Sequence, residues 1–238
     1  MSITSIVPFG CCCGPATLLK RNGLRNKSCF FDWLDGNLFS YIDVVNNNFE
    51  DVLNVTYLVQ MFDNPSIILN KRYNFSFVHL FDRKKTFSEQ IYAVQSKVSK
   101  QIKNFKECLN GDSLLLYYCR DRNEMLEIIE RQQDILKFSD YYKTSFVFVF
   151  NYEPKSSFCF KYYVVPQNNT HFPFGGGVTS PFICEDLEKY LISIFDENIR
   201  KQNLKWKDPE KNLINRIKRK IYSFKKDKLI ISQSSEED

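Results

Sequence analysis

The sequence is poor in histidine and in the residues that break regular structure. It has 8 glycines and 8 prolines among 238 residues, which argues against a collagen-like or disordered chain. Its 2 histidines, His79 and His171, leave few partners for any chemistry that pairs a cysteine with an imidazole. No apolar run reaches the roughly 18 residues that a membrane-spanning helix needs. We therefore expect no transmembrane segment.

The amino terminus lacks the features of a secretory signal. The stretch MSITSIVPFG has no basic segment followed by a long apolar one. Eight cysteines would suit a disulfide-rich secreted scaffold only in a much shorter chain. We therefore expect a cytoplasmic protein whose thiols are reduced.

The cysteines also lack the spacing of a metal site. Zinc ligands usually come in pairs such as C-x-x-C, whereas Cys11, Cys12 and Cys13 are contiguous and the other five are scattered. A disulfide between such neighbours would be strained. The glycine run at 175–177 is not followed by the Lys-Ser/Thr of a phosphate-binding loop. We expect neither a metal nor a cofactor.

What the chain does have is apolar and aromatic side chains. Hydrophobic residues make up 43% of it and aromatic residues 16%, which is enough for a large core. A length of 238 residues suits one large domain or a domain with an extension. The formal charge of +5 is mild and does not by itself indicate nucleic-acid binding.

Hydrophobic periodicity predicts alternating strands and helices. We expect strands at 2–10, 73–81, 113–120, 144–152 and 157–165, the last of them at a sheet edge. We expect helices between Pro15 and Gly23, at 38–45, at 86–109 and at 122–137, and two more opened by Ser180-Pro181 and Asp208-Pro209. Thr86 and Glu89 form a capping box for the long helix.

This order predicts the α/β class: a single three-layer domain with a mainly parallel sheet, helices on both faces and a C-terminal helical extension. We place the α/β domain at residues 1–204, a basic amphipathic helix at 205–230 and a disordered acidic tail at 231–238.

Polar residues follow several of the predicted strands. Ligand sites in parallel sheets lie at the carboxyl ends of the strands. The first strand is followed by the three contiguous cysteines and the second by His79 and Asp82. The later two end at Arg120 with Asp121 and at Asn151. If these strands are parallel, the polar residues share one edge.

Cys13 precedes the helix that follows the first strand. Helix N-termini stabilise a thiolate, and their N–H groups bind oxyanions or phosphates. Gly14 would let a substrate approach the backbone, and His79 is the better histidine partner. The alternative is that the three cysteines are small buried apolar residues at a tight crossing. The sequence leaves both interpretations open.

Other candidates also have two interpretations each. Asp121 could orient an imidazole or cap a helix. Asp32, among aromatic residues, could be desolvated with a raised pKa or could cap the next helix. His171 lies in a glycine-containing loop and could belong to a mobile lid or be solvated.

A basic run precedes the acidic tail. It could rest on an anionic membrane surface or on nucleic acid, or form a solvated helix face. Its members are Lys211, Arg216, Lys218, Arg219, Lys220, Lys225, Lys226 and Lys228.

The first sixty residues resemble a bacterial family called putative papain-like cysteine peptidases. The likeness rests on Gly10-x-x-Cys13, on LLKRNGLR at 18–25 and on the FDW stretch at 31–33, followed by His79. Members commonly read Gly-Ser-Asn-Cys, then Pro-Phe-Asp-Trp, then His-Asp. This chain has Cys-Cys for Ser-Asn, Phe for Pro and Leu after the histidine. The resemblance implies Cys–His chemistry, carried over to Gly10, Cys13, Asp32, Trp33 and His79.

The first functional hypothesis is a cysteine-nucleophile hydrolase or acyl transferase acting on an unknown ester, amide or thioester. Cys13 attacks and His79 serves as base and acid. Asp82, Asp121 and Asp32 are candidates to orient the imidazole, and Gly10, Cys12 and Gly14 are candidates for the oxyanion site. The alternative is a non-enzymatic module that binds an anionic sugar phosphate or nucleotide-like ligand at the same edge, with Arg120 and Asn151.

Overall fold

The structure is a computed structural model that describes residues 3–10, 13–25, 27–82, 84–165 and 184–205. The chain divides into two compact units, Met1–Asp196 and Glu197–Asp238. The described part of the second unit is helix α7 (Glu197–Lys205), where Lys201 pairs with Glu197 at 2.8 Å. All other elements belong to the first unit.

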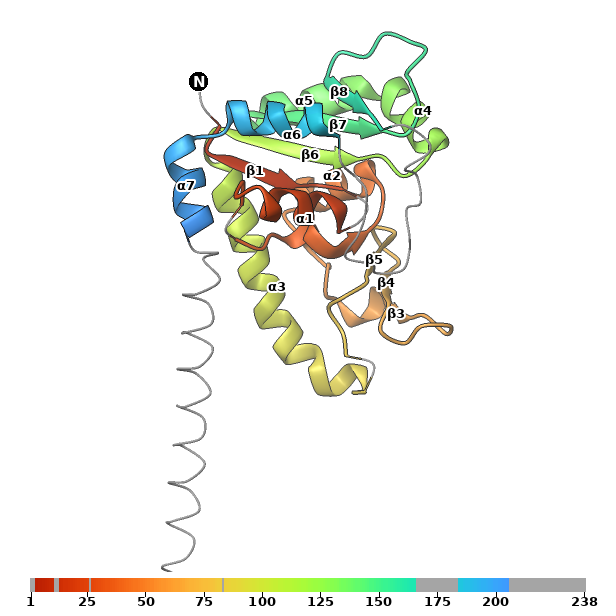
Figure 1. Ribbon diagram of the computed structural model, residues 1–238. Helices are drawn as coiled ribbons and strands as arrows, with labels where there is room; N and C mark the ends of the chain where they lie inside the picture. The colour runs from red at the N-terminus through yellow and green to blue at the C-terminus, as the bar shows by residue number, and fades with distance from the viewer. Residues whose placement is uncertain (1–2, 11–12, 26, 83, 166–183, 206–238) are drawn as a thin grey trace, which may run out of the picture. The chain divides into compact units, whose positions relative to one another are not determined.

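A parallel sheet of four strands forms the centre of the first unit (Figure 1). Its order is β1 (Ser5–Pro8), β6 (Ser113–Tyr118), β7 (Thr144–Phe150) and β8 (Lys161–Val164). The register aligns Ser5 with Ser113 and Ser113 with Thr144. The sheet confirms the mixed α/β class, and β8 is the edge strand that the sequence predicts.

Alternate residues of these strands face two different layers. Phe9 and Phe146 turn to the layer that holds α2 (Leu38–Asn46), α3 (Phe87–Leu109) and α5 (Gln132–Tyr142). There Phe9 packs on Phe105 and Phe138 with ring centroids 5.9 and 6.1 Å apart. Helices α1 (Gly14–Arg21) and α6 (Glu185–Ile194) lie together in front of the sheet in Figure 1.

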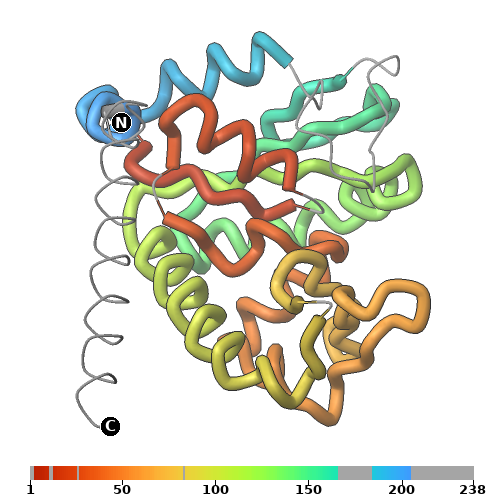
Figure 2. The backbone as a smooth tube through the Cα atoms, turned by 60° about the horizontal axis from the view of Figure 1, so that its bottom comes forward, coloured from red at the N-terminus to blue at the C-terminus, as the bar shows by residue number. Residues whose placement is uncertain are grey.

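A second sheet holds the strand around Phe75, and this corrects one expectation. β5 (Phe75–Phe77) pairs antiparallel with β2 (Leu34–Asp35) and with β4 (Ile68–Asn70), which in turn pairs with β3 (Leu58–Gln60). The prediction that His79 and Asp82 follow a strand of the parallel sheet is therefore wrong. Two buried phenylalanines alternate with the half-buried Ser76, the pattern typical of an antiparallel strand covered on one face. In both views this sheet lies on the opposite side of the parallel sheet from α6 (Figure 2).

Local signals set most helix boundaries. The Thr86–Glu89 capping box begins α3, and Gly23, with φ of 72°, follows the end of α1. The helix predicted at 122–137 is instead two helices, α4 (Arg122–Glu130) and α5, which meet at Arg131. Residues 180–183, 206–230 and the predicted tail lie outside the described residues. Within the described ranges, no helix is long and apolar enough to cross a membrane.

Candidate functional site

Cys13 lies at the junction between β1 and α1, and its side chain is exposed. It occupies the N-cap position, Gly14 begins the helix, and Pro15 stands in its first turn, where a missing N–H costs nothing. The Cys13 side chain makes no capping bond, and the first turn holds no acidic residue. The partial positive charge of the helix therefore adjoins an exposed thiol. The alternative interpretation, a buried apolar side chain, is wrong for Cys13.

Gly10 packs the end of β1 tightly against its neighbours. A Cβ atom there would lie 2.9 Å from the backbone nitrogen of Tyr118 and 3.3 Å from Cγ of Pro15. The first atom belongs to the end of β6 and the second to α1. Glycine therefore allows this junction to lie directly on the end of the neighbouring strand.

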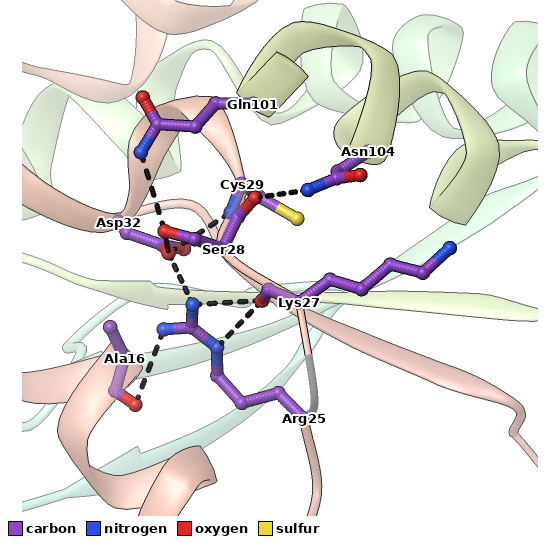
Figure 3. A network of polar contacts seen from close by, with 8 residues as sticks. All are labelled: Ala16, Arg25, Lys27, Ser28, Cys29, Asp32, Gln101 and Asn104. Atoms are coloured by element: carbon purple, nitrogen blue, oxygen red, sulfur yellow. Dashed lines mark hydrogen bonds and ion pairs between the residues drawn. The ribbon is translucent and has the colours of Figure 1, made fainter. Parts of the chain in front are cut away.

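Asp32 is fully buried at the centre of the polar network in Figure 3. Its Oδ2 pairs with the guanidinium of Arg25 and accepts from the hydroxyl of Ser28 at 2.7 Å and from the N–H of Cys29 at 3.0 Å. Burial raises the pKa of Asp32, while Arg25 acts to lower it. Of the two interpretations of Asp32, the desolvated carboxyl with a raised pKa agrees with this burial. The carboxylate caps its own short helix η1 (Phe30–Trp33), whereas Asn37 caps the next helix, α2.

Arg25 also connects this network to α1. Its guanidinium donates to the carbonyl oxygens of Ala16 in α1, at 3.5 Å, and Lys27, at 2.8 Å (Figure 3). The segments 18–25 and 31–33, which carry the family resemblance, are therefore held together by the Arg25–Asp32 ion pair. This pair fixes η1 relative to the helix that begins after Cys13.

His79 lies beside Trp33. The two rings meet edge to face with centroids 5.7 Å apart and an interplanar angle of 83°. The contact follows from the register of the second sheet, in which Leu34 pairs with Phe77, two residues before His79. The imidazole is exposed. A series of contacts therefore runs from α1 to His79. Arg25 binds both α1 and Asp32, Asp32 lies in η1, and Trp33 at the end of η1 contacts the His79 ring.

Arg120 joins the end of β6 to the second sheet. Its guanidinium donates to Oδ1 of Asp35 at 2.8 Å and to the carbonyl of Gly36 at 3.0 Å. Burial raises the pKa of Asp35, and Arg120 opposes that shift. The Asn151 amide at the end of β7 donates to the carbonyl of Arg120 at 3.4 Å. The end of β6 thus contacts both the Gly10 junction and the sheet that carries His79.

The carboxylates of Asp82 and Asp121 bind nearby backbone N–H groups. Oδ1 of Asp82 accepts from the N–H of Lys84 at 2.9 Å in the loop after β5. Oδ1 of Asp121 accepts from the N–H of Glu124 at 3.0 Å, so the capping interpretation of Asp121 is confirmed.

Glu124 is a buried acid at the same strand end, and it is not among the candidates expected from the sequence. It accepts from the hydroxyl of Tyr117 and from the N–H of Arg120, the latter at 2.6 Å. Burial raises its pKa above the usual glutamate value. The sequence signal that could have identified Glu124 is an acidic residue in the first turn of a helix that directly follows an apolar strand.

Several candidates lie outside the described residues: Cys12, His171 and the glycines at 175–177. Among the residues that are described, no cluster of three or more His, Cys, Asp or Glu side chains could hold a metal ion.

The exposed cysteine after β1 and the motifs around it lie in a mixed α/β protein. The family model described as "putative papain-like cysteine peptidase (DUF1796)" matches residues 4–151. The chain therefore belongs to this family, the one that its N-terminal motifs resemble. Neither a curated protein nor a solved structure matches the chain.

Proposed function

We propose that the protein is a cysteine-nucleophile hydrolase or acyl transferase that acts on an ester, amide or thioester. The observation that carries the proposal is the exposed Cys13 thiol at the N-terminus of α1. Such a position favours the thiolate, the nucleophilic form, through unpaired N–H groups and the helix dipole. Family membership supports the same chemistry.

In the proposed reaction the Cys13 sulfur attacks the substrate carbonyl carbon, and its proton passes to His79. The tetrahedral oxyanion accepts hydrogen bonds from backbone N–H groups at the start of α1, beginning with Gly14. The bond to the leaving group breaks, and His79 gives that group its proton. The acyl group is now bound to the Cys13 sulfur as a thioester. Water or another acceptor attacks this thioester, which releases the acyl group and restores the Cys13 thiol.

The proposed role of the surrounding residues is to position the imidazole and the helix. Trp33 contacts the His79 ring, and Asp32 and Arg25 fix the short helix that ends in Trp33. Asp32 is a positioning residue in this proposal because its carboxylate is buried against Arg25 and local N–H groups. In this proposal the reactive carbonyl of the substrate lies against the Cys13 sulfur, and the substrate does not contact Arg25 or Asp32.

The alternative, a module that binds an anionic sugar phosphate or nucleotide, has less support. Arg120, its expected cation, is already in an ion pair with Asp35 at 2.8 Å. In such a module the thiol has no role, so Cys13→Ser would leave ligand affinity unchanged.

The test compares acylation of the wild type with acylation of three variants. We expect the wild type to be acylated at position 13 by activated esters and thioesters, and Cys13→Ala to lose this adduct. We expect His79→Ala to slow acylation. Cys159→Ser removes another exposed thiol and serves as the control that leaves acylation unchanged. Equal acylation of Cys13→Ala and wild type would overturn the proposal.

A further inference from the structure

Strand β3 forms an outer edge of the antiparallel sheet. The strand order is β2, β5, β4 and β3, so among the described residues β3 pairs with β4 alone. The β3–β4 hairpin projects outward from this sheet in both views (Figures 1 and 2). The outer side of such a strand offers backbone donors and acceptors to a further strand, and proteins usually protect it with charges or prolines.

The segment around β3 has neither protection. Residues 55–62 read VTYLVQMF, which holds no charged residue and no proline. The Phe62 side chain is 99% exposed, and that of Met61 is exposed as well. The other end strand of this sheet, β2, has only two residues, and its Asp35 is bound by Arg120. β3 is therefore the edge of this sheet that is suited to pairing with another chain.

Hydrogen bonds within the hairpin show which backbone groups of β3 face outward. The N–H of Lys71 donates to the carbonyl of Tyr57 at 2.9 Å. The N–H of Met61 donates to the carbonyl of Ile67 at 3.0 Å. Backbone groups of successive residues alternate between the two sides of an antiparallel strand. Since Tyr57 and Met61 face β4, the N–H and C=O of Gln60 face away from it.

These outward groups complement a second copy of themselves. Gln60 presents one donor and one acceptor, so two copies of it related by a two-fold axis can exchange two backbone hydrogen bonds. The same axis places Leu58 opposite Phe62 of the other copy, and Val59 opposite Met61. Both pairs are apolar, and the uncharged segment brings no like charges together.

We propose that β3 is a homodimer interface, in which two copies of the chain pair antiparallel about a two-fold axis at Gln60. The sheet then runs through both copies, β2-β5-β4-β3 followed by β3-β4-β5-β2. A second copy is the occupant that supplies both the backbone partners of Gln60 and an apolar side chain, Leu58, against the exposed Phe62 ring. The association is weak and reversible, because β3 has three residues, whereas a standard interface buries about 800 Å² per partner.

The test measures sedimentation equilibrium of the full-length protein over a series of concentrations, in a reducing buffer that prevents cross-linking through exposed cysteines. We expect a reversible equilibrium between monomer and dimer. Gln60→Pro removes the donor of both central hydrogen bonds and should abolish the dimer, while its ring is tolerated where the N–H faces away from the sheet. Phe62→Ser should weaken association by about tenfold or more, because each dimer covers two of these rings.

A charge exchange at the axis tests the register. Gln60→Glu and Gln60→Lys each place like charges opposite one another and should weaken self-association about two- to fivefold. An equal mixture of these two variants should dimerise at least as well as the wild type. Gln95→Glu makes the same charge change on the exposed side of α3 and is the matched control, which should leave the dimer unchanged. Circular dichroism and urea unfolding verify that each variant folds.

The outcome does not depend on the proposed function, since Cys13→Ala should dimerise like the wild type. A wild-type chain that stays monomeric at every concentration would overturn the proposal, whether or not an unrelated extended peptide binds β3. A dimer that keeps its strength in Gln60→Pro would place the interface elsewhere. Open-ended growth beyond the dimer would mean a head-to-tail contact instead of a two-fold one.

Discussion

Glu124 is a carboxylate held in the protein interior by two donors, the hydroxyl of Tyr117 and the N–H of Arg120. Burial raises its pKa in the folded protein, whereas in the unfolded chain it titrates near its usual value of about 4.3. Between these two values the native state keeps a proton that the unfolded chain has released. Stability must therefore fall as the pH rises through that window.

We predict that Glu124→Gln flattens this dependence. The slope of unfolding free energy against pH should decrease by at most about 1.4 kcal/mol per pH unit, the value for one proton. Urea unfolding at a series of pH values from about 4 upward measures it. Glu127→Gln, on the exposed side of the same helix, is the control and should keep the wild-type slope. An unchanged slope in Glu124→Gln would show that the acid is already ionised throughout the window.

Single residues could be predicted from the sequence where their immediate neighbours decide the outcome. The raised pKa of Asp32 follows from the aromatic residues beside it, and the caps formed by Asp121 and Thr86 follow from spacing. The ion pair of Asp32 with Arg25 could not be predicted. It depends on how residues 22–25 and 27–29 lie on α1 and α3, which no periodicity encodes.

At the scale of elements, the β1–α1 junction leaves no room for a side chain at Gly10. We predict that Gly10→Ala destabilises the protein by ~1–3 kcal/mol, the usual cost of forcing an extra methyl into a packed region. The methyl would meet backbone atoms of β6, which cannot rotate away. Because the junction must shift, alkylation of Cys13 should change as well.

Chemical denaturation and the rate of Cys13 alkylation measure these two effects. Gly111→Ala is the matched control, because its added Cβ would lie 3.5 Å from Oγ1 of Thr4, an ordinary contact. Equal stability of the two variants would mean that β1 and β6 can separate without cost.

The longest helix and the two longest strands were predicted well, and the shortest strands were not. The 23 residues of α3 give several turns of one apolar face, and β6 and β7 are continuous apolar runs. Strands β2, β3 and β4 have two or three residues each, too few to show a period of two. Their pairing places His79 beside Trp33, so this part of the site depends on the least predictable elements.

At the scale of the whole molecule, charge is unevenly distributed along the chain. Residues 197–238 hold 12 of the 33 basic and 7 of the 28 acidic side chains, so they account for the full formal charge of +5. The first unit, Met1–Asp196, is therefore formally neutral. Any attraction to an anionic surface that depends on net charge must come from the second unit.

We predict that the full chain binds vesicles rich in anionic phospholipid and that a chain ending at Asp196 does not. Binding should weaken with added salt, because screening shortens the reach of surface charges. Cosedimentation measures it, with neutral vesicles as the control. Cooperative urea unfolding of the shortened chain establishes that the first unit remains folded. Equal binding by both chains would contradict the prediction.

The strand order has a consequence for synthesis of the chain. Among the strands of the described residues, β1 pairs with β6 alone, and Ser5 meets Ser113, 108 positions later. At 5–20 residues per second, a ribosome needs roughly 5–20 s to add those residues. During that time the nascent amino terminus has no strand to pair with. Cys13 can take its place at the start of α1 against the sheet only after β6 has emerged, so the candidate nucleophile is encoded early but positioned late.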